Sequence, residues 1–129
     1  MKSNEFLTEG YNQEQLDAFI AYVRNKLHMG DNMPKIEYSE EKEGPDQHRT
    51  GYYDANTDTM WIYTGNRNTV DIMRTLAHEL THHKQRLDGR TSANSPIVDL
   101  ETQADVAAGM IMKLYVRQHP EIIEWDTVI

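Results

Sequence analysis

The chain has 129 residues, a formal net charge of −8 from 21 acidic and 13 basic side chains, and no cysteine. This length supports a single modest core, so one domain is expected over residues 1–129. The lack of cysteine excludes disulfides and thiolate metal sites. The acidic balance argues against nucleic acid as a partner. Since no apolar window is long enough to span a membrane, no membrane partner and a cytoplasmic location are expected.

The first periodic segment begins after residue 11 and predicts a helix. Asn12 and Gln15 form a capping-box-like start, apolar residues recur at helical spacing, and Gly30 is a stop signal. Residues 1–11 are expected to be flexible. The apolar positions of this helix are Leu16, Phe19, Ile20, Val23 and Leu27.

Segments rich in aromatic and β-branched residues follow. PKIEYS predicts a short strand, and EEKEGPDQHR predicts a charged loop. In TGYYDANTDTMWIYTGN two such runs flank the turn formers DANTD, which predicts a β-hairpin. The hairpin would pair Gly51 to Asp54 with Thr59 to Thr64, so the β component is expected to be a short hairpin or antiparallel sheet.

Two further helices are predicted in the second half of the chain. Asn68 is an N-cap for a helix that Gly89 follows. Ser95 and Pro96 are an N-cap and first-turn pair for a last helix, which ends at Pro120. The tail EIIEWDTVI has no assignment. The apolar positions are Val70, Met73, Leu76, Ala77, Leu80 and Leu87 in one helix and Ile97, Leu100, Ala104, Ala108, Ile111 and Tyr115 in the other.

Three of the six histidines lie in RTLAHELTHHKQRLDG, on the second predicted helix. At about 100° per residue, His78 and His82 project from one face, whereas His83 lies about 140° from His78. His83 is therefore interpreted as a bystander. Glu79 completes the H-E-x-x-H pattern HELTH. Two imidazoles at this spacing can bind zinc, and the adjacent carboxylate can take a proton from the water that the ion activates. An incidental cluster of surface charges is the alternative interpretation.

Two histidines leave a tetrahedral zinc ion short of a third protein ligand. Glu101 lies nineteen residues after His82, beyond a loop long enough to bring the last helix back against the second. Asp105 follows one turn later, where it could accept a hydrogen bond from the non-liganding nitrogen of a zinc-bound histidine; His78 is the expected partner. Solvated acids at the helix edge are the alternative. Both acids adjoin the face expected to pack inward, where ionised groups usually have a partner.

H-E-x-x-H followed by E-x-x-x-D on the next helix resembles the gluzincin zinc metallopeptidases. Residues 50–115 look most similar to minimal gluzincin domains of the ImmA/IrrE type. The resemblance implies a small α+β zincin-like domain that hydrolyses peptide or protein substrates. It also implies that His78, His82 and Glu101 hold Zn²⁺, that Glu79 is the general base, and that Asp105 orients a histidine. A site of two histidines and one glutamate also accepts Co²⁺ or Mn²⁺.

In those domains an aromatic-rich strand upstream of the zinc helix forms the edge of the cleft, where an extended peptide adds as a further strand. The resemblance places MWIYTGN, with Trp61 and Tyr63, in this position; ordinary strand packing is the alternative. No motif identifies the side chain that stabilises the oxyanion. The open candidates are Tyr52, Tyr53, Tyr63, His48 and Arg86.

A second function stays open: a non-enzymatic binding or assembly protein whose zinc is structural or whose site is degenerate. Glu79 beside a complete ligand set argues against it, since a structural site needs no base and usually has four protein ligands. The small size argues for it. The opening MKSNEFLTEG resembles the starts of tailed-phage proteins, and a phage origin would place the chain in the host cytoplasm or the virion. An ordinary disordered start is the commoner source of such a stretch.

Overall fold

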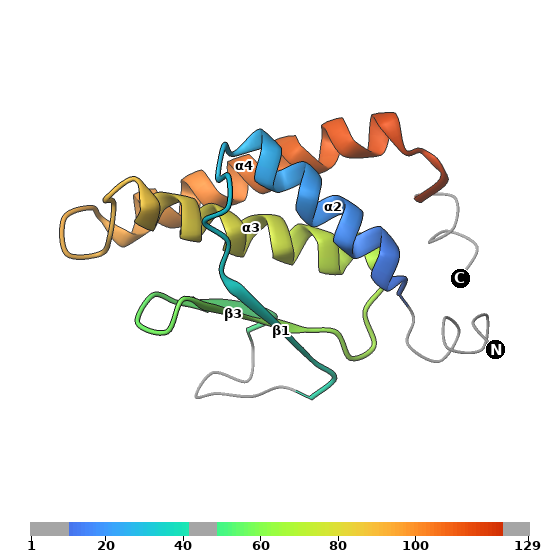
Figure 1. Cartoon of the computed structure of the whole chain (residues 1–129), viewed down its shortest axis with the longest axis horizontal. Helices are drawn as coiled ribbons and strands as arrows, with labels where there is room; N and C mark the ends of the chain where they lie inside the picture. Colours follow the sequence, from blue (N-terminus) through green and yellow to red (C-terminus); the bar gives the residue numbers. More distant parts are fainter. Residues whose placement is uncertain (1–10, 42–48, 123–129) are drawn as a thin grey trace.

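Three helices cover one face of a three-stranded sheet (Figure 1). The fold is known from a computed structural model, which describes residues 11–41 and 49–122. This arrangement confirms the predicted small α+β class. None of the described helices is long and apolar enough to cross a membrane. The elements are α2 (Gln13–Lys26), β1 (Lys35–Ser39), β2 (Gly51–Asp54), β3 (Thr59–Tyr63), α3 (Thr69–Leu87) and α4 (Ile97–Gln118).

The first two helices begin at the predicted N-caps. The side-chain oxygen of Asn12 accepts hydrogen bonds from the backbone of Glu14 at 2.9 Å and of Gln15 at 3.3 Å. Asn68 accepts one from the backbone of Asp71 at 2.9 Å. Each cap satisfies backbone N–H groups that have no partner inside the helix.

The last helix begins one residue later than the sequence predicts. Pro96 occupies the N-cap position and contributes no side-chain hydrogen bond. The hydroxyl of Ser95, the predicted cap, lies instead 3.0 Å from Asn94 Oδ1 in the preceding turn. Ser95 is therefore part of the loop before α4, because the local turn engages its side chain first.

The end of α3 confirms the stop signal at Gly89. Gly89 has a φ of +80°, which glycine adopts without steric cost. Its N–H donates to the carbonyl of Arg86 at 2.9 Å, and the N–H of Arg90 donates to the carbonyl of Gln85 at 2.8 Å. These two bonds make a Schellman motif, which fixes the direction in which the chain leaves α3.

The predicted hairpin is confirmed, but the sheet is mixed rather than antiparallel throughout. Gly51 pairs with Ile62 and Asp54 with Thr59 in antiparallel register between β2 and β3. β1 pairs with β3 in parallel, so the strand order is β1-β3-β2. A tight turn specifies its own two strands, whereas the long connection after β1 lets that strand join the other side of β3 in either direction.

This order makes one prediction about the substrate strand wrong. Trp61 and Tyr63 were expected on an edge strand, but β3 lies between β1 and β2 and has no free edge. The ring of Trp61 is buried, with its centroid 5.6 Å from that of Tyr52 and 6.4 Å from that of Tyr63. These aromatic residues pack on the sheet, and among the described strands the free edge beside α3 is that of β2.

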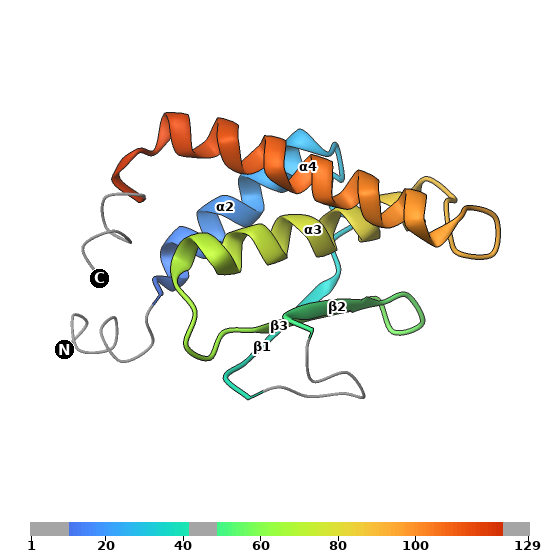
Figure 2. The same ribbon diagram turned by 180° about the vertical axis from the view of Figure 1, so that it is seen from behind.

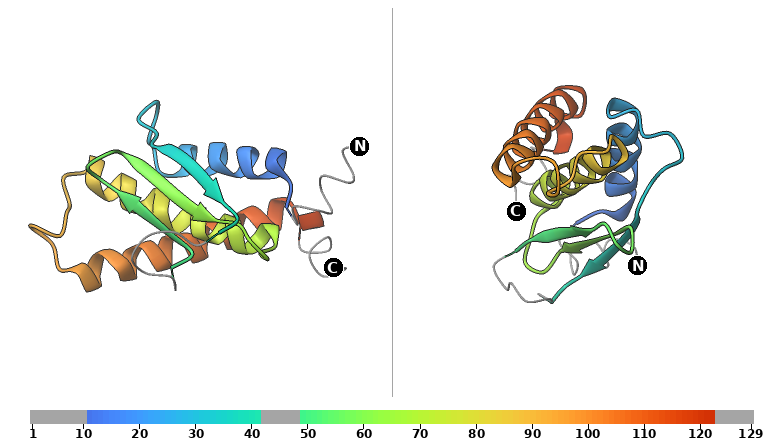
Figure 3. Two further views of the ribbon diagram at one scale, coloured as in Figure 1. Left: turned by 90° about the horizontal axis from the view of Figure 1, so that it is seen from below. Right: turned by 90° about the vertical axis from the view of Figure 1, so that its left-hand side faces the viewer.

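α3 lies between the sheet and the other two helices (Figure 2, Figure 3). Because it is covered on more than one side, even polar residues in its second half, such as Glu79 and Gln85, are buried. Two residues predicted on apolar stripes are exposed instead, Leu87 by 37% and Ile97 by 63%. The expected flexible start lies outside the described residues except for Tyr11, which packs in the core. The core includes Leu16, Phe19, Val23, Met60, Ile62, Ile72, Met73, Leu76, Leu80, Ala108 and Ile111.

Candidate metal centre and active site

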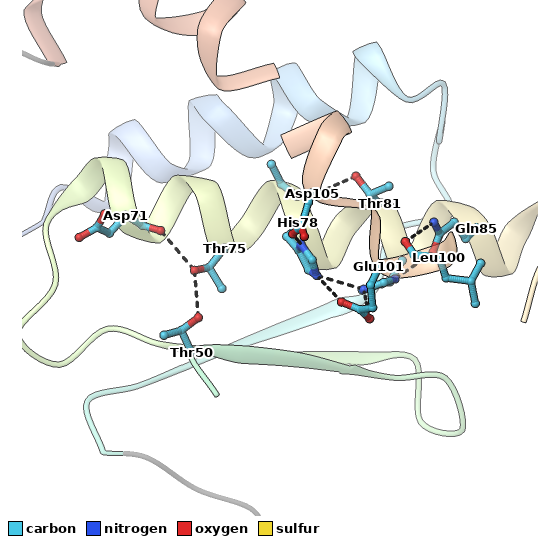
Figure 4. A network of polar contacts seen from close by, with 11 residues as sticks. Thr50, Asp71, Thr75, His78, Thr81, Gln85, Leu100, Glu101 and Asp105 are labelled. Carbon is cyan, nitrogen blue, oxygen red and sulfur yellow. Dashed lines mark hydrogen bonds and ion pairs between the residues drawn. The ribbon is translucent and has the colours of Figure 1, made fainter. Parts of the chain in front are cut away.

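The two motif histidines of α3 and a glutamate of α4 converge on one point (Figure 4). The Nε2 atoms of His78 and His82 are 3.1 Å apart. The carboxylate of Glu101 lies 3.2 Å from His78 Nε2 and 3.0 Å from His82 Nε2. Helical periodicity places the two imidazoles on one face, and the packing of α4 along α3 brings the carboxylate to them.

The outer nitrogen of His78 has the partner that the sequence predicts. Its Nδ1 lies 2.9 Å from Oδ1 of Asp105, one turn along α4 from Glu101. An ionised carboxylate only accepts hydrogen bonds, so Nδ1 carries the proton and donates it to Asp105. In the neutral ring this tautomer places the lone pair of His78 on Nε2, facing Glu101.

His82 has a corresponding partner that sequence reasoning missed. Its Nδ1 lies 2.8 Å from Oε1 of Gln85, whose amide nitrogen donates to the carbonyl of Leu100 at 3.0 Å. A carbonyl only accepts, so the amide NH₂ of Gln85 faces Leu100 and its oxygen faces His82. The proton of His82 therefore also lies on Nδ1. The available signal was the spacing, because Gln85 lies three residues after His82 and so near the same helix face.

Three electron-pair donors thus face one another at 3.0–3.2 Å with both imidazole protons pointing away. Such a cluster repels itself unless a cation or extra protons lie at its centre. With metal–ligand bonds of 2.0–2.2 Å, ligands around a tetrahedral zinc ion are separated by about 3.3 Å. Glu101 faces His78 with Oε1 and His82 with Oε2, so two imidazole nitrogens and this carboxylate form a donor set that suits zinc.

No known protein family, curated protein or solved structure matches the chain. The gluzincin resemblance therefore rests on the motif residues.

The carboxyl group of Glu79 is buried beside the histidines, with 7% of the residue exposed. Burial, together with the negative charge of Glu101, raises the pKa of Glu79 to about 8, against an opposing effect of Arg49. A divalent cation held by the neighbouring ligands would act in the opposite direction, because it favours the ionised carboxylate. Glu79 is thus a carboxyl group whose proton affinity depends strongly on the charge next to it.

These residues line a cleft of about 750 Å³ between α3, α4 and β2. β2 approaches α3 closely at Gly51, where a Cβ atom would lie 2.7 Å from Thr75 Cγ2 and 3.0 Å from the carbonyl oxygen of Trp61. Nearby, the hydroxyl groups of Thr50 and Thr75 are 3.5 Å apart. The absence of a side chain at position 51 is therefore what lets the strand lie against α3 about one turn before His78.

Of the candidates for the oxyanion-stabilising residue, Tyr53 and Arg86 line the cleft. Both are already hydrogen-bonded. Arg86 Nε donates to the hydroxyl of Tyr53 at 2.6 Å, and that hydroxyl donates to Asp58 Oδ1 at 2.8 Å. Tyr52 and Tyr63 are not among the lining residues, and His48 lies outside the described residues.

His83 lies off the face that carries His78 and His82, as predicted, but it is part of the core. Only 1% of it is exposed, its Nδ1 lies 3.0 Å from the hydroxyl of Tyr53, and its Nε2 lies 2.5 Å from the carbonyl oxygen of Asn32. The signal in the sequence was its spacing from Leu76 and Leu80, which puts it on the buried stripe of α3. His83 therefore links α3 to the hairpin and to the segment before β1.

Proposed function

We propose that the chain is a zinc-dependent metallopeptidase that hydrolyses peptide or protein substrates in the cytoplasm. The observation that carries the proposal is the convergence of His78, His82 and Glu101, with both histidine protons directed outward by Asp105 and Gln85. Neutral imidazoles presenting Nε2 lone pairs beside a carboxylate are the donor set of catalytic zinc sites.

A zinc ion bound by these residues would polarise a peptide carbonyl and make water more acidic. Glu79 then accepts a proton from the attacking water and delivers it to the leaving amine. Asp105 and Gln85 hold the histidine rings in orientation. β2 runs along the cleft with one edge that pairs with no other described strand, and this edge offers backbone hydrogen bonds to an extended peptide.

The openness of the site favours catalysis over a structural role for the metal. A structural zinc ion usually has four protein ligands and is closed to solvent. Here three ligands converge, and 53% of the Glu101 side chain is exposed. The buried carboxyl group of Glu79 has no function in a purely structural site, so a non-enzymatic binding protein explains the residues less completely.

Substitution of Glu79 by glutamine separates metal binding from catalysis. We expect Glu79→Gln to retain zinc, because the three ligands are unchanged, and to lose hydrolysis by about 10²- to 10⁴-fold, the usual contribution of a general base. Zinc content and cleavage of a fluorogenic peptide library are measured in parallel. Glu14→Gln, on the exposed face of α2, is the matched control. Undiminished hydrolysis by zinc-loaded Glu79→Gln would refute the assigned role.

A further inference from the structure

The cleft contains a concentration of arginine that the proposed chemistry does not use. Four of the chain's seven arginines line it, whereas no lysine of the described residues does. The cleft is also lined by three carboxylic acids. Glu101 and Asp105 belong to the proposed metal centre, and Glu79 is the proposed base. The cleft is thus more positive than a chain with a net charge of −8 would suggest. The four residues are Arg49, Arg74, Arg86 and Arg90.

Two of these arginines continue the helical row that carries the histidines. Arg74 lies four residues before His78 and Arg86 four residues after His82 on α3. Residues four apart on a helix share a face and are separated by about 6 Å along the axis. The metal centre is therefore bracketed by a guanidinium group on either side along the cleft.

Only some of these groups are engaged by the protein itself. Arg86 bonds to the hydroxyl of Tyr53 and to Asp58, and Arg90 bonds to Gln103. Arg74 is exposed, and no hydrogen bond or ion pair joins it to any residue in 11–41 or 49–122. Its guanidinium group is thus available to a ligand, and the described fold does not depend on it.

Arg49 lines the same part of the cleft as Arg74, because it directly precedes the point where β2 approaches α3. It precedes Thr50, and Arg74 precedes Thr75; the two threonine hydroxyls are 3.5 Å apart (Figure 4). The charge of Arg49 also acts on Glu79, which places it within electrostatic reach of the reacting groups. Two cations therefore flank the point where β2 meets α3, on the His78 side of the centre.

We propose that Arg74, supported by Arg49, binds a carboxylate of the substrate, so that the enzyme selects acidic peptides. This inference rests on the proposed peptidase function, whose substrate class it names. A guanidinium group binds a carboxylate through two parallel hydrogen bonds, a geometry that lysine does not reproduce. One helical turn corresponds to about two residues of extended peptide, so the carboxylate lies within about two residues of the scissile bond.

The test measures peptide binding separately from hydrolysis. Zinc-loaded full-length Glu79→Gln is titrated, by fluorescence anisotropy, with peptide pairs that differ only in Asp or Glu against Asn or Gln. A second set compares free with amidated C-termini, which distinguishes a side-chain carboxylate from a terminal one. We expect acidic peptides to bind at least about 10-fold more tightly, as for a hydrogen-bonded charged pair.

Variants at position 74 assign the preference. Adding Arg74→Ala to Glu79→Gln should remove most of the preference for acidic peptides without weakening the binding of the Asn, Gln or C-terminally amidated peptides. With Arg74→Lys in its place, only part of the preference should remain. Arg117→Ala, at the exposed end of α4, is the matched control and should change neither. Arg74 is exposed, so these variants should fold, which circular dichroism checks. The ratio of kcat/KM for acidic and amide peptides in the wild-type background gives a second measurement independent of Glu79→Gln.

The outcomes separate this inference from the proposed function. Equal affinity for acidic and amide peptides, no binding of either, or a preference that survives Arg74→Ala would overturn the carboxylate site. Hydrolysis of both kinds of peptide at equal rates would overturn the carboxylate site and leave the peptidase proposal intact. A preference that depends on Arg74, together with no hydrolysis by the wild type, would support the binding site and refute the peptidase proposal.

Discussion

The outer hydrogen bonds of His78 and His82 determine which ring nitrogen each histidine turns toward Glu101. Asp105 accepts from Nδ1 of His78 and Gln85 accepts from Nδ1 of His82, so in the neutral rings both Nε2 atoms present lone pairs. The two partners differ in exposure, since 73% of the Asp105 side chain is exposed whereas Gln85 is buried. Gln85 also bonds to α4 at Leu100, next to Glu101, and so helps to position both His82 and Glu101.

Removing this amide should weaken metal binding. We expect Gln85→Leu to bind zinc about 10- to 100-fold less tightly, the usual effect of losing an outer hydrogen-bond partner of a ligand. Competition against a chromophoric chelator measures the affinity, and circular dichroism checks the fold. Gln118→Leu, at the exposed end of α4, is the control. An affinity for Gln85→Leu within about twofold of the wild type would show that the amide does not orient His82.

Asp58 gives the hairpin loop a pH-dependent contact with α3. Burial alone would raise the pKa of Asp58, but hydrogen bonds from Tyr53 and Arg86, with the nearby charges of His83 and Arg86, lower it. A carboxyl group whose pKa is lower in the folded state stabilises that state above its unfolded pKa. This contribution is lost as the pH falls through the folded pKa.

Stability measurements at two pH values test this contact. Near pH 7, metal-free Asp58→Asn should unfold at a lower urea concentration than the wild type. The difference should be smaller near pH 3, because the contribution of the ionised carboxylate declines once the pH falls below the ordinary aspartate pKa of about 3.9 and is lost through the lower folded pKa. Asp99→Asn, exposed at the start of α4, is the control for loss of one surface charge. A difference between Asp58→Asn and the wild type that is the same at both pH values would contradict the role of the ionised carboxylate.

The relation between β2 and α3 gives the cleft its width. The two elements approach at Gly51, where the side chain of Thr75 and the carbonyl of Trp61 leave no room for a methyl group. The free edge of β2 is thereby held beside the histidine row. A strand displaced by even a small distance would change how an extended peptide lies across the centre.

A methyl group at position 51 should separate these elements. We expect Gly51→Ala to lower the free energy of unfolding by about 1–3 kcal/mol through overpacking and to reduce kcat/KM. Gly109→Ala is the matched control, because a Cβ there meets no atom within 4 Å. In a helix interior that change should instead raise stability by about 0.5–1 kcal/mol. Urea denaturation compares the two variants, and equal effects would show that β2 does not need the close approach.

Local signals predicted most elements correctly, and a non-local pairing escaped them. Asn12 and Asn68 cap helices, and Gly89 ends one, because each acts through hydrogen bonds or dihedral angles within a few residues. The turn DANTD specifies the hairpin in the same way. The parallel pairing of β1 with β3 depends on a long connection that has no such signal. Because of this pairing, β3 is the central strand of the sheet rather than the predicted edge strand.

The molecule as a whole determines which side chains reach the site. Helical geometry predicted the position of His78, His82 and Glu101, because their spacing needs only two adjacent helices. The burial of His83 and the positions of the cleft arginines depend on which faces of α3 are covered by the sheet, α2 and α4. That arrangement follows from the whole fold, so periodicity along one helix did not reveal it.

The proposed metal centre would join α3 to α4, and its most direct test is the zinc content of the purified protein. After reconstitution with zinc and dialysis, mass spectrometry should find about one zinc ion per chain in the wild type and far less in Glu101→Ala. Glu37→Ala, exposed on β1, should retain it. No bound zinc in the wild type, or undiminished zinc in Glu101→Ala, would contradict the assigned ligand set and with it the proposed peptidase.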